Sequence, residues 1–221
     1  MRRAALLATL LLASALPAEA QRVVVERGNV VYHPASGASR RLTTLGLDSA
    51  AVLSPDGRSV AFVRGTPGRA IASSAYESEA RELWIVGVDG VDGAGARMLV
   101  RGDEGSTPET VVARIADPRF SPDGERIYFE SDAWVTSPSV HVVEVATGRE
   151  RFVVPGSLVE VVPRGEYRGH LVVEQHRYFP AGGSYDWLYL FSPDGREVGV
   201  IGDGEGNGLE EFRETYVKEE Q

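Results

Sequence analysis

Residues 120–130, Phe-Ser-Pro-Asp-Gly-Glu-Arg-Ile-Tyr-Phe-Glu, predict a β-hairpin. Pro122 presets φ at the second position of a tight turn, Asp123 can hydrogen-bond to the backbone of the turn, and Gly124 supplies the positive φ that closes it. The residues after the turn are rich in β-branched and aromatic side chains, which favour a return strand.

The same hairpin occurs earlier, where residues 53–63 read Leu-Ser-Pro-Asp-Gly-Arg-Ser-Val-Ala-Phe-Val. A third Ser-Pro-Asp-Gly, at residues 192–195, corresponds instead to Ala-Thr-Gly at residues 146–148, so we expect it to join an outer pair of strands. The third strands of successive repeats are centred near Val31, Trp84, His141 and Tyr189. Their spacing of about fifty residues is typical of propeller blades.

The whole pattern predicts sheets without helices between them. About fifteen strands joined in chain order by tight turns give an antiparallel meander. Successive apolar residues, as at 61–63 and 188–191, indicate strands that are buried on both faces. The predicted fold is therefore all-β, a β-propeller of about four blades of four-stranded antiparallel sheet, with the first strand missing from the first blade.

The composition narrows the function classes. The chain has 221 residues, of which 43% are hydrophobic and 8% aromatic, as in a globular protein. Its formal net charge of −9 argues against a nucleic-acid partner, because binding phosphates needs a basic surface. Without cysteine, the chain has no disulfide, thiolate nucleophile or lipid-modified N-terminal cysteine.

Residues 1–20 have the pattern of a cleavable signal peptide. Arg2 and Arg3 form a positive start, residues 4–16 are an apolar run too short to span a membrane, and Ala-Glu-Ala at 18–20 is a cleavage site. A buried helix is the alternative interpretation. We expect a periplasmic or secreted protein with no membrane span after the signal is removed.

Three features together resemble the TolB-type β-propeller repeat: the Ser-Pro-Asp-Gly hairpins, the strand Glu-Leu-Trp-Ile at residues 82–85, and the outer turn at 146–148. The resemblance covers residues 21–202. It implies a bacterial propeller that works in the periplasm with protein partners of the cell envelope. TolB-like proteins also carry an α/β domain before a larger ring, and this chain has no room for that domain. The motif is specific for the fold and weak for the function.

Residues 203–221 form an acidic, Gly-rich C-terminal segment that bears on how the propeller closes. Residues 213–218 would supply the strand missing from the first blade and protect an exposed sheet edge. Two alternatives are that this chain is half of a larger ring, completed by a second copy in a homodimer, and that the gene is a fragment. A solvated helix over residues 210–220 also fits the charges of this segment.

The functional site is expected on the face of the propeller with long loops, predicted at residues 65–81, 101–114, 131–139 and 177–186. These loops hold the aromatic residues Tyr76, Trp134, Tyr178, Phe179 and Tyr185. We predict that these side chains anchor a protein or another ligand. The alternative is that they only pack the loops against the sheets.

The sequence identifies no catalytic residue, metal site or cofactor. The histidines His33, His141, His170 and His176 lack zinc-site spacing, and no Gly-x-Ser-x-Gly elbow is present. Residues 203–214 match the ligand order of a calcium loop in part, and a Gly-rich exposed turn is the favoured alternative. The sequence therefore favours a non-enzymatic exported propeller that acts as a binding scaffold in the cell envelope. The alternative function is a propeller-type hydrolase or lyase with its site on the long-loop face.

Overall fold

The computed structural model describes residues 20–72, 77–90, 95–134 and 137–218. The predicted signal peptide, apart from Ala20, lies outside the described residues, and so does Tyr76. In the described part of the chain, no helix has the length and apolar character needed to cross a membrane.

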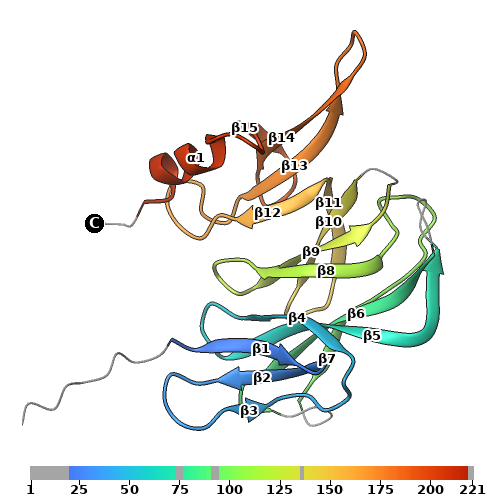
Figure 1. The fold of residues 1–221 in the computed structure, drawn as a ribbon, viewed down its shortest axis with the longest axis vertical. Helices are drawn as coiled ribbons and strands as arrows, with labels where there is room; N and C mark the ends of the chain where they lie inside the picture. The colour runs from blue at the N-terminus through green and yellow to red at the C-terminus, as the bar shows by residue number, and fades with distance from the viewer. Residues whose placement is uncertain (1–19, 73–76, 91–94, 135–136, 219–221) are drawn as a thin grey trace, which may run out of the picture.

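The described residues fold into strands followed by a C-terminal helix (Figure 1). In chain order the strands are β1 (Arg22–Glu26), β2 (Asn29–His33), β3 (Arg40–Arg41), β4 (Asp48–Leu53), β5 (Ser59–Ala72), β6 (Glu77–Gly87), β7 (Arg97–Arg101), β8 (Ala113–Phe120), β9 (Arg126–Asp132), β10 (Pro138–Glu144), β11 (Glu150–Pro155), β12 (Ser157–Val161), β13 (Leu171–Tyr178), β14 (Ser184–Phe191) and β15 (Glu197–Asp203). Helix α1 spans Gly208–Tyr216.

The strands form four antiparallel sheets, which we call blades 1 to 4. Blade 1 is β1–β3, blade 2 is β4–β7, blade 3 is β8–β11 and blade 4 is β12–β15. Figure 1 shows the blades following one another in chain order, from blue to red. This confirms the predicted all-β propeller of about four blades, and blade 1 has three strands as the repeat predicted.

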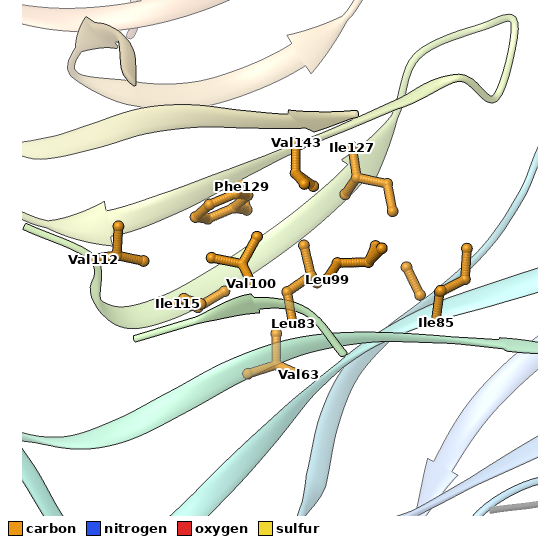
Figure 2. Close-up of a cluster of buried hydrophobic side chains, with 11 residues drawn as sticks. Val63, Leu83, Ile85, Leu99, Val100, Val112, Ile115, Ile127, Phe129 and Val143 are labelled. Carbon is orange, nitrogen blue, oxygen red and sulfur yellow. The ribbon is translucent and has the colours of Figure 1, made fainter. Parts of the chain in front are cut away.

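Apolar side chains between neighbouring blades form the core. Blade 1 packs on blade 2 through a cluster around Phe62, and blade 3 packs on blade 4 through one that includes Tyr128 and Tyr189. Figure 2 shows the cluster between blades 2 and 3, to which Leu83 of β6 and Phe129 of β9 belong. Strands β5 of blade 2 and β14 of blade 4 are buried on both faces along residues 61–63 and 188–191, as the unbroken apolar runs there predicted.

The Ser-Pro-Asp-Gly turns are held by contacts within the turn. Ser54 Oγ donates a hydrogen bond of 2.6 Å to Asp56 Oδ1 and accepts one of 2.9 Å from the N–H of Ser59. Gly57 has a φ of 71°. The hydrogen bond from Ser54, and then the one from the N–H of Arg58, lower the pKa of Asp56. The turn between β8 and β9 repeats these contacts, so each aspartate is engaged by its own turn.

The C-terminal segment is a helix, so the closing strand predicted for residues 213–218 is wrong. Glu210 and Glu211 lie in the first turn of α1, where the helix dipole favours acidic side chains. Phe212 is 8% exposed and packs, with Leu190, on the face of blade 4 that points away from blade 3. Burying the apolar side chains of α1 against blade 4 stabilises the helix relative to a strand paired with blade 1.

The array of blades is open in the described residues. Blades 1 and 4 lie at opposite ends of the molecule in Figure 1, so they do not close a four-bladed ring. Helix α1 covers the outer face of blade 4, on which a further blade would pack. A second copy that extended the ring at this end would have to displace α1.

Two of the predicted long loops are continuations of strands. β5 runs to Ala72 and β6 begins at Glu77, so most of the loop predicted at residues 65–81 is paired. β13 and β14 likewise leave only residues 179–183 unpaired in the loop predicted at 177–186. The loops were predicted because these segments are rich in polar residues, but the backbone of polar residues can pair in a strand as well. In β5 the pairing with β6 resumes after a bulge between Gly65 and Ala70.

Candidate functional site

The hairpin formed by β13 and β14 extends past the rest of blade 4, at the upper right of Figure 1. Its strands pair without a register shift up to Tyr178 opposite Ser184. At the tip, the N–H of Phe179 donates to the carbonyl of Gly183 over 3.0 Å. Gly182 and Gly183 have φ values of 97° and 87°, which glycine adopts without a Cβ clash, so the chain reverses here.

Three aromatic side chains, Phe179, Tyr185 and Trp187, lie along this hairpin, and we call them the aromatic row. Tyr185 and Trp187 point to the same face because they are alternate residues of one strand. Their ring centroids are 5.3 Å apart, and the Phe179 ring lies 4.5 Å from that of Tyr185. Phe179 is 51% exposed and Trp187 is 38% exposed. Exposed aromatic rings gathered in this way are typical of binding surfaces.

Arg177 fixes the base of the aromatic row. Its guanidinium carbon lies 3.6 Å from the centroid of the Tyr189 ring, and its Nη2 pairs with Glu197 over 2.6 Å. The same Nη2 donates to Gln175 Oε1 over 2.6 Å. Burial, and then the hydrogen bond with Tyr185, raise the pKa of the Tyr189 hydroxyl. Because Tyr189 packs on blade 3, the row continues the face that already contacts protein.

The opposite face of the hairpin carries polar groups beside the row. His176 Nδ1 lies 2.8 Å from Asp186 Oδ1. The His176 ring meets the Tyr178 ring edge to face, with 5.0 Å between centroids. Tyr178 is 68% exposed, so this second face provides a polar rim with one exposed ring.

The structure brings together three of the five predicted aromatic residues. These are Tyr178, Phe179 and Tyr185. Trp134 lies apart on blade 3, where its ring packs against Phe152 with 6.2 Å between centroids and is partly buried. For Trp134, the packing alternative therefore describes the side chain better, while Tyr76 lies outside the described residues.

Sequence reasoning missed Trp187, because this residue lies between the loop predicted at residues 177–186 and the apolar run at 188–191. The useful signal is the Tyr-x-Trp pattern at residues 185–187, which puts two large rings on one face of a strand. Read together with the predicted loop at 177–186, this pattern indicates a strand that continues beyond the core.

The corresponding hairpin of blade 2 shows a covered version of the same construction. β5 and β6 also continue past their blade, and there Ile71 is 1% exposed and Ala80 0% exposed. Both pack with Val111 and Ala113, at the start of blade 3. Protein side chains therefore cover the extension of blade 2, whereas the aromatic row of blade 4 is open to solvent.

Ser139, His141 and Glu150 form a hydrogen-bonded chain in the order of a Ser-His-Glu triad, which sequence reasoning also missed. Ser139 Oγ lies 2.9 Å from His141 Nε2, and His141 Nδ1 lies 2.5 Å from Glu150 Oε1. Ser139 and His141 are both 0% exposed, and Ser139 Oγ also donates to the Ser131 carbonyl over 3.1 Å. A substrate has no access to this serine, so the chain satisfies polar groups in the core.

Residues 203–214, which match the ligand order of a calcium loop in part, span the end of β15, a short turn and most of α1. Asp203 Oδ1 accepts the N–H of Gly206, and Glu214 lies within α1. Over the ranges that the structure describes, no three histidine, cysteine, aspartate or glutamate side chains lie together in a way that could hold a metal ion.

No protein-family model and no curated protein matches this sequence. Several solved structures are similar in fold. The propeller domain of the Trilobed protease from Pyrococcus furiosus is 14% identical, with 79% of this chain and 48% of that chain covered and a TM-score of 0.51. An oligogalacturonate lyase in complex with manganese is 15% identical, with 80% and 42% covered and a TM-score of 0.51. Dipeptidyl peptidase 4 of Porphyromonas gingivalis is 12% identical, with 83% and 31% covered and a TM-score of 0.52.

These similarities establish the β-propeller fold and no more, because the identities are low. The matched region spans less than half of each of these proteins.

Proposed function

We propose that this chain is a non-enzymatic exported β-propeller that binds a protein partner through the aromatic row and its polar rim. The main observation in support is that the aromatic row is exposed to solvent. The corresponding hairpin of blade 2 is covered by other side chains of the protein. The signal-peptide pattern of residues 1–20 and the resemblance to TolB-type repeats support a partner in the cell envelope, in the periplasm of a bacterium.

The form of the row suits a polypeptide surface. On the same face of β14, but closer to the core, Tyr189 packs on the apolar side chains of blade 3. The row therefore extends a face that already contacts another sheet of the protein. Arg177 and its partners hold the rings in place, which reduces the conformational entropy lost on binding. Phe179 and Trp187 are about half exposed, so burying either should contribute roughly 1 kcal/mol, half of what full burial gives.

Catalysis is the second candidate, and the observation that favours it is the triad order of Ser139, His141 and Glu150. Its rank is lower because Ser139 is 0% exposed. A fluorophosphonate probe separates the two functions. A scaffold leaves the native protein unlabelled, whereas a serine hydrolase is labelled at Ser139 and loses the label in Ser139→Ala.

The binding proposal is tested by site-specific photo-crosslinking in the bacterium that makes the protein. A photoreactive amino acid replaces Tyr178, which is 68% exposed on the rim. We expect one discrete heterologous polypeptide to crosslink, and its yield to fall about fivefold when Phe179→Ala or Trp187→Ala is added, since about 1.4 kcal/mol is a factor of ten. Tyr216, 38% exposed on α1, is the control position for the photoreactive group and should not capture the same polypeptide.

Three results would count against the proposal. The first is a crosslinked adduct whose yield is unchanged by Phe179→Ala and by Trp187→Ala. The second is an adduct with a second copy of this chain, which would replace the heterologous partner by self-association. The third is equal capture of the same polypeptide from position 216. Circular dichroism of the Phe179 and Trp187 variants confirms beforehand that the blades remain folded.

A further inference from the structure

A small polar cavity of about 180 Å³ lies between blades 3 and 4. It is lined by Arg126, Val142, Glu144, Arg149, Arg151 and Asp194. These residues come from the beginning of β9, the end of β10, the start of β11 and the turn between β14 and β15. They lie at the tight-turn end of the blades, whereas the aromatic row lies at the end where the hairpins extend. The cavity and the row are therefore separate features.

Two of the three arginines in the lining have carboxylate partners. Arg149 Nη2 lies 2.6 Å from Glu144 Oε1, and Glu144 Oε2 also accepts the hydroxyl of Thr147 over 2.9 Å. Arg151 Nη2 lies 3.1 Å from Asp194 Oδ1. Each of these carboxylates is thus engaged at one side of the cavity.

Arg126 has no such partner. It stands directly opposite Glu144 across the β9–β10 pair, but Glu144 is turned to Arg149 and Thr147. Among the residues that the structure describes, no carboxylate lies within ion-pair distance, 4.0 Å, of Arg126. The nearby Tyr128 hydroxyl donates to the carbonyl of Pro193 over 3.4 Å, and burial raises the pKa of this hydroxyl.

The residues of the lining include three guanidinium groups and two carboxylates, an excess of one positive charge within the lining itself. Asp123 and Asp194 act on Arg126 only through space. This local excess stands out in a chain with a net charge of −9. A guanidinium fork matches the geometry of carboxylate and phosphate oxygens, which bind it through paired hydrogen bonds.

The geometry points to a binding site for a small oxyanion, with Arg126 as its principal ligand and Arg149 and Arg151 at its sides. The cavity volume of about 180 Å³ equals that of a few water molecules at ~30 Å³ each. It accepts phosphate or a short carboxylate and is too small for a sugar chain or a nucleotide. A more open hollow of about 510 Å³ shares Arg126 and Glu144 and adds one arginine, Arg97, and one carboxylate, Glu125, so Arg126 borders both spaces.

Isothermal titration calorimetry of the full chain tests this site with two probes, inorganic phosphate and malonate, each against sodium chloride at equal ionic strength. We expect saturable binding of one or both probes at one site per chain. Binding of phosphate alone assigns a phosphoryl ligand, and binding of malonate alone assigns a carboxylate ligand. Heat that does not exceed the chloride control for either probe overturns the proposal.

Two substitutions with opposite expected effects make the test specific. Arg126→Gln should weaken binding at least tenfold, whereas Asp194→Asn, which removes a negative charge from the lining, should strengthen it severalfold. Arg40→Gln is the matched control, because Arg40 pairs with Asp89 on blades 1 and 2, away from the cavity. Unchanged affinity in both cavity variants would refute the assignment, and the Asp194 variant keeps the test decisive if Arg126→Gln does not fold.

Discussion

Replacing Asp48 by asparagine should destabilise the protein strongly, because it removes the carboxylate with which a buried arginine is paired. Arg64 Nε and Nη2 donate to the two carboxylate oxygens of Asp48 over 2.6 and 3.1 Å. The side chains are 8% and 0% exposed, respectively. The guanidinium also lies 5.1 Å from the Phe62 ring and 5.0 Å from the Trp84 ring, between blades 1 and 2. Water therefore has little access to the charge that remains.

The magnitude follows from this burial. Removing one partner of a buried ion pair costs about 3–5 kcal/mol. Asparagine keeps one acceptor for Arg64, so we expect the lower end, about 3 kcal/mol, for Asp48→Asn. With a urea m-value of roughly 2 kcal/mol/M, the unfolding midpoint should fall by about 1.5 M.

Urea unfolding followed by circular dichroism measures this change, and a second ion pair provides the control. Arg40 and Asp89 also lie 2.6 Å apart, but their side chains are 44% and 86% exposed. Asp89→Asn removes the same charge and should cost less than about 1 kcal/mol. If Asp48→Asn costs no more than Asp89→Asn, the inference from burial fails. Adding Arg64→Met to Asp48→Asn should recover much of the stability, since it also removes the buried guanidinium charge.

Three further predictions concern packing and pH. Trp134→Ala should lower the free energy of unfolding by about 2 kcal/mol in urea titrations, because the Trp134 ring packs on Phe152. Phe179→Ala should change it by less than about 0.5 kcal/mol, because the Phe179 ring is exposed. Burial raises the pKa of the Glu130 carboxyl, so the folded state binds the carboxyl proton more tightly than the unfolded state does. The free energy of unfolding therefore decreases as the pH rises from the pKa of Glu130 in the unfolded state to its pKa in the folded state. Glu130→Gln should therefore gain stability relative to the native protein between acid and neutral pH in melting scans, and a constant difference would contradict this. Phe212→Ala should cost about 3 kcal/mol in urea titrations and expose the outer face of blade 4 to hydrophobic dyes, and an unchanged midpoint would show that α1 does not stabilise that blade.

The fold was predictable because its signals are local. Each Ser-Pro-Asp-Gly turn closes through contacts among a few neighbouring residues, such as Ser54 with Asp56 and Ser59. The local amino-acid sequence is therefore sufficient to predict that the chain reverses there. The C-terminal helix was harder. Leu209 and Phe212 have helical spacing, but the choice between helix and strand depended on the exposed face of blade 4, which the linear sequence does not display.

The candidate site was predictable only in part, for the same reason. Tyr178, Phe179 and Tyr185 are neighbours along one hairpin, so their grouping follows from a turn. The chain Ser139–His141–Glu150 needs the register between β10 and β11, and a bulge between Val140 and His141 shifts that register. Which residue stands opposite His141 therefore cannot be derived from alternation.

The two ends of the blades differ in how their side chains are used. At the tight-turn end, Asp123 bonds to the backbone of its own turn and Asp194 pairs with Arg151, so neither forms an ion pair with Arg126. At the other end, Arg177 is held by Tyr189 and Glu197, and the aromatic row rests on it. An exposed row contributes little to the stability of the free protein and raises the risk of aggregation. Rings held in a fixed geometry lose little entropy on binding, and this is the physical reason why we propose a partner for the anchored row.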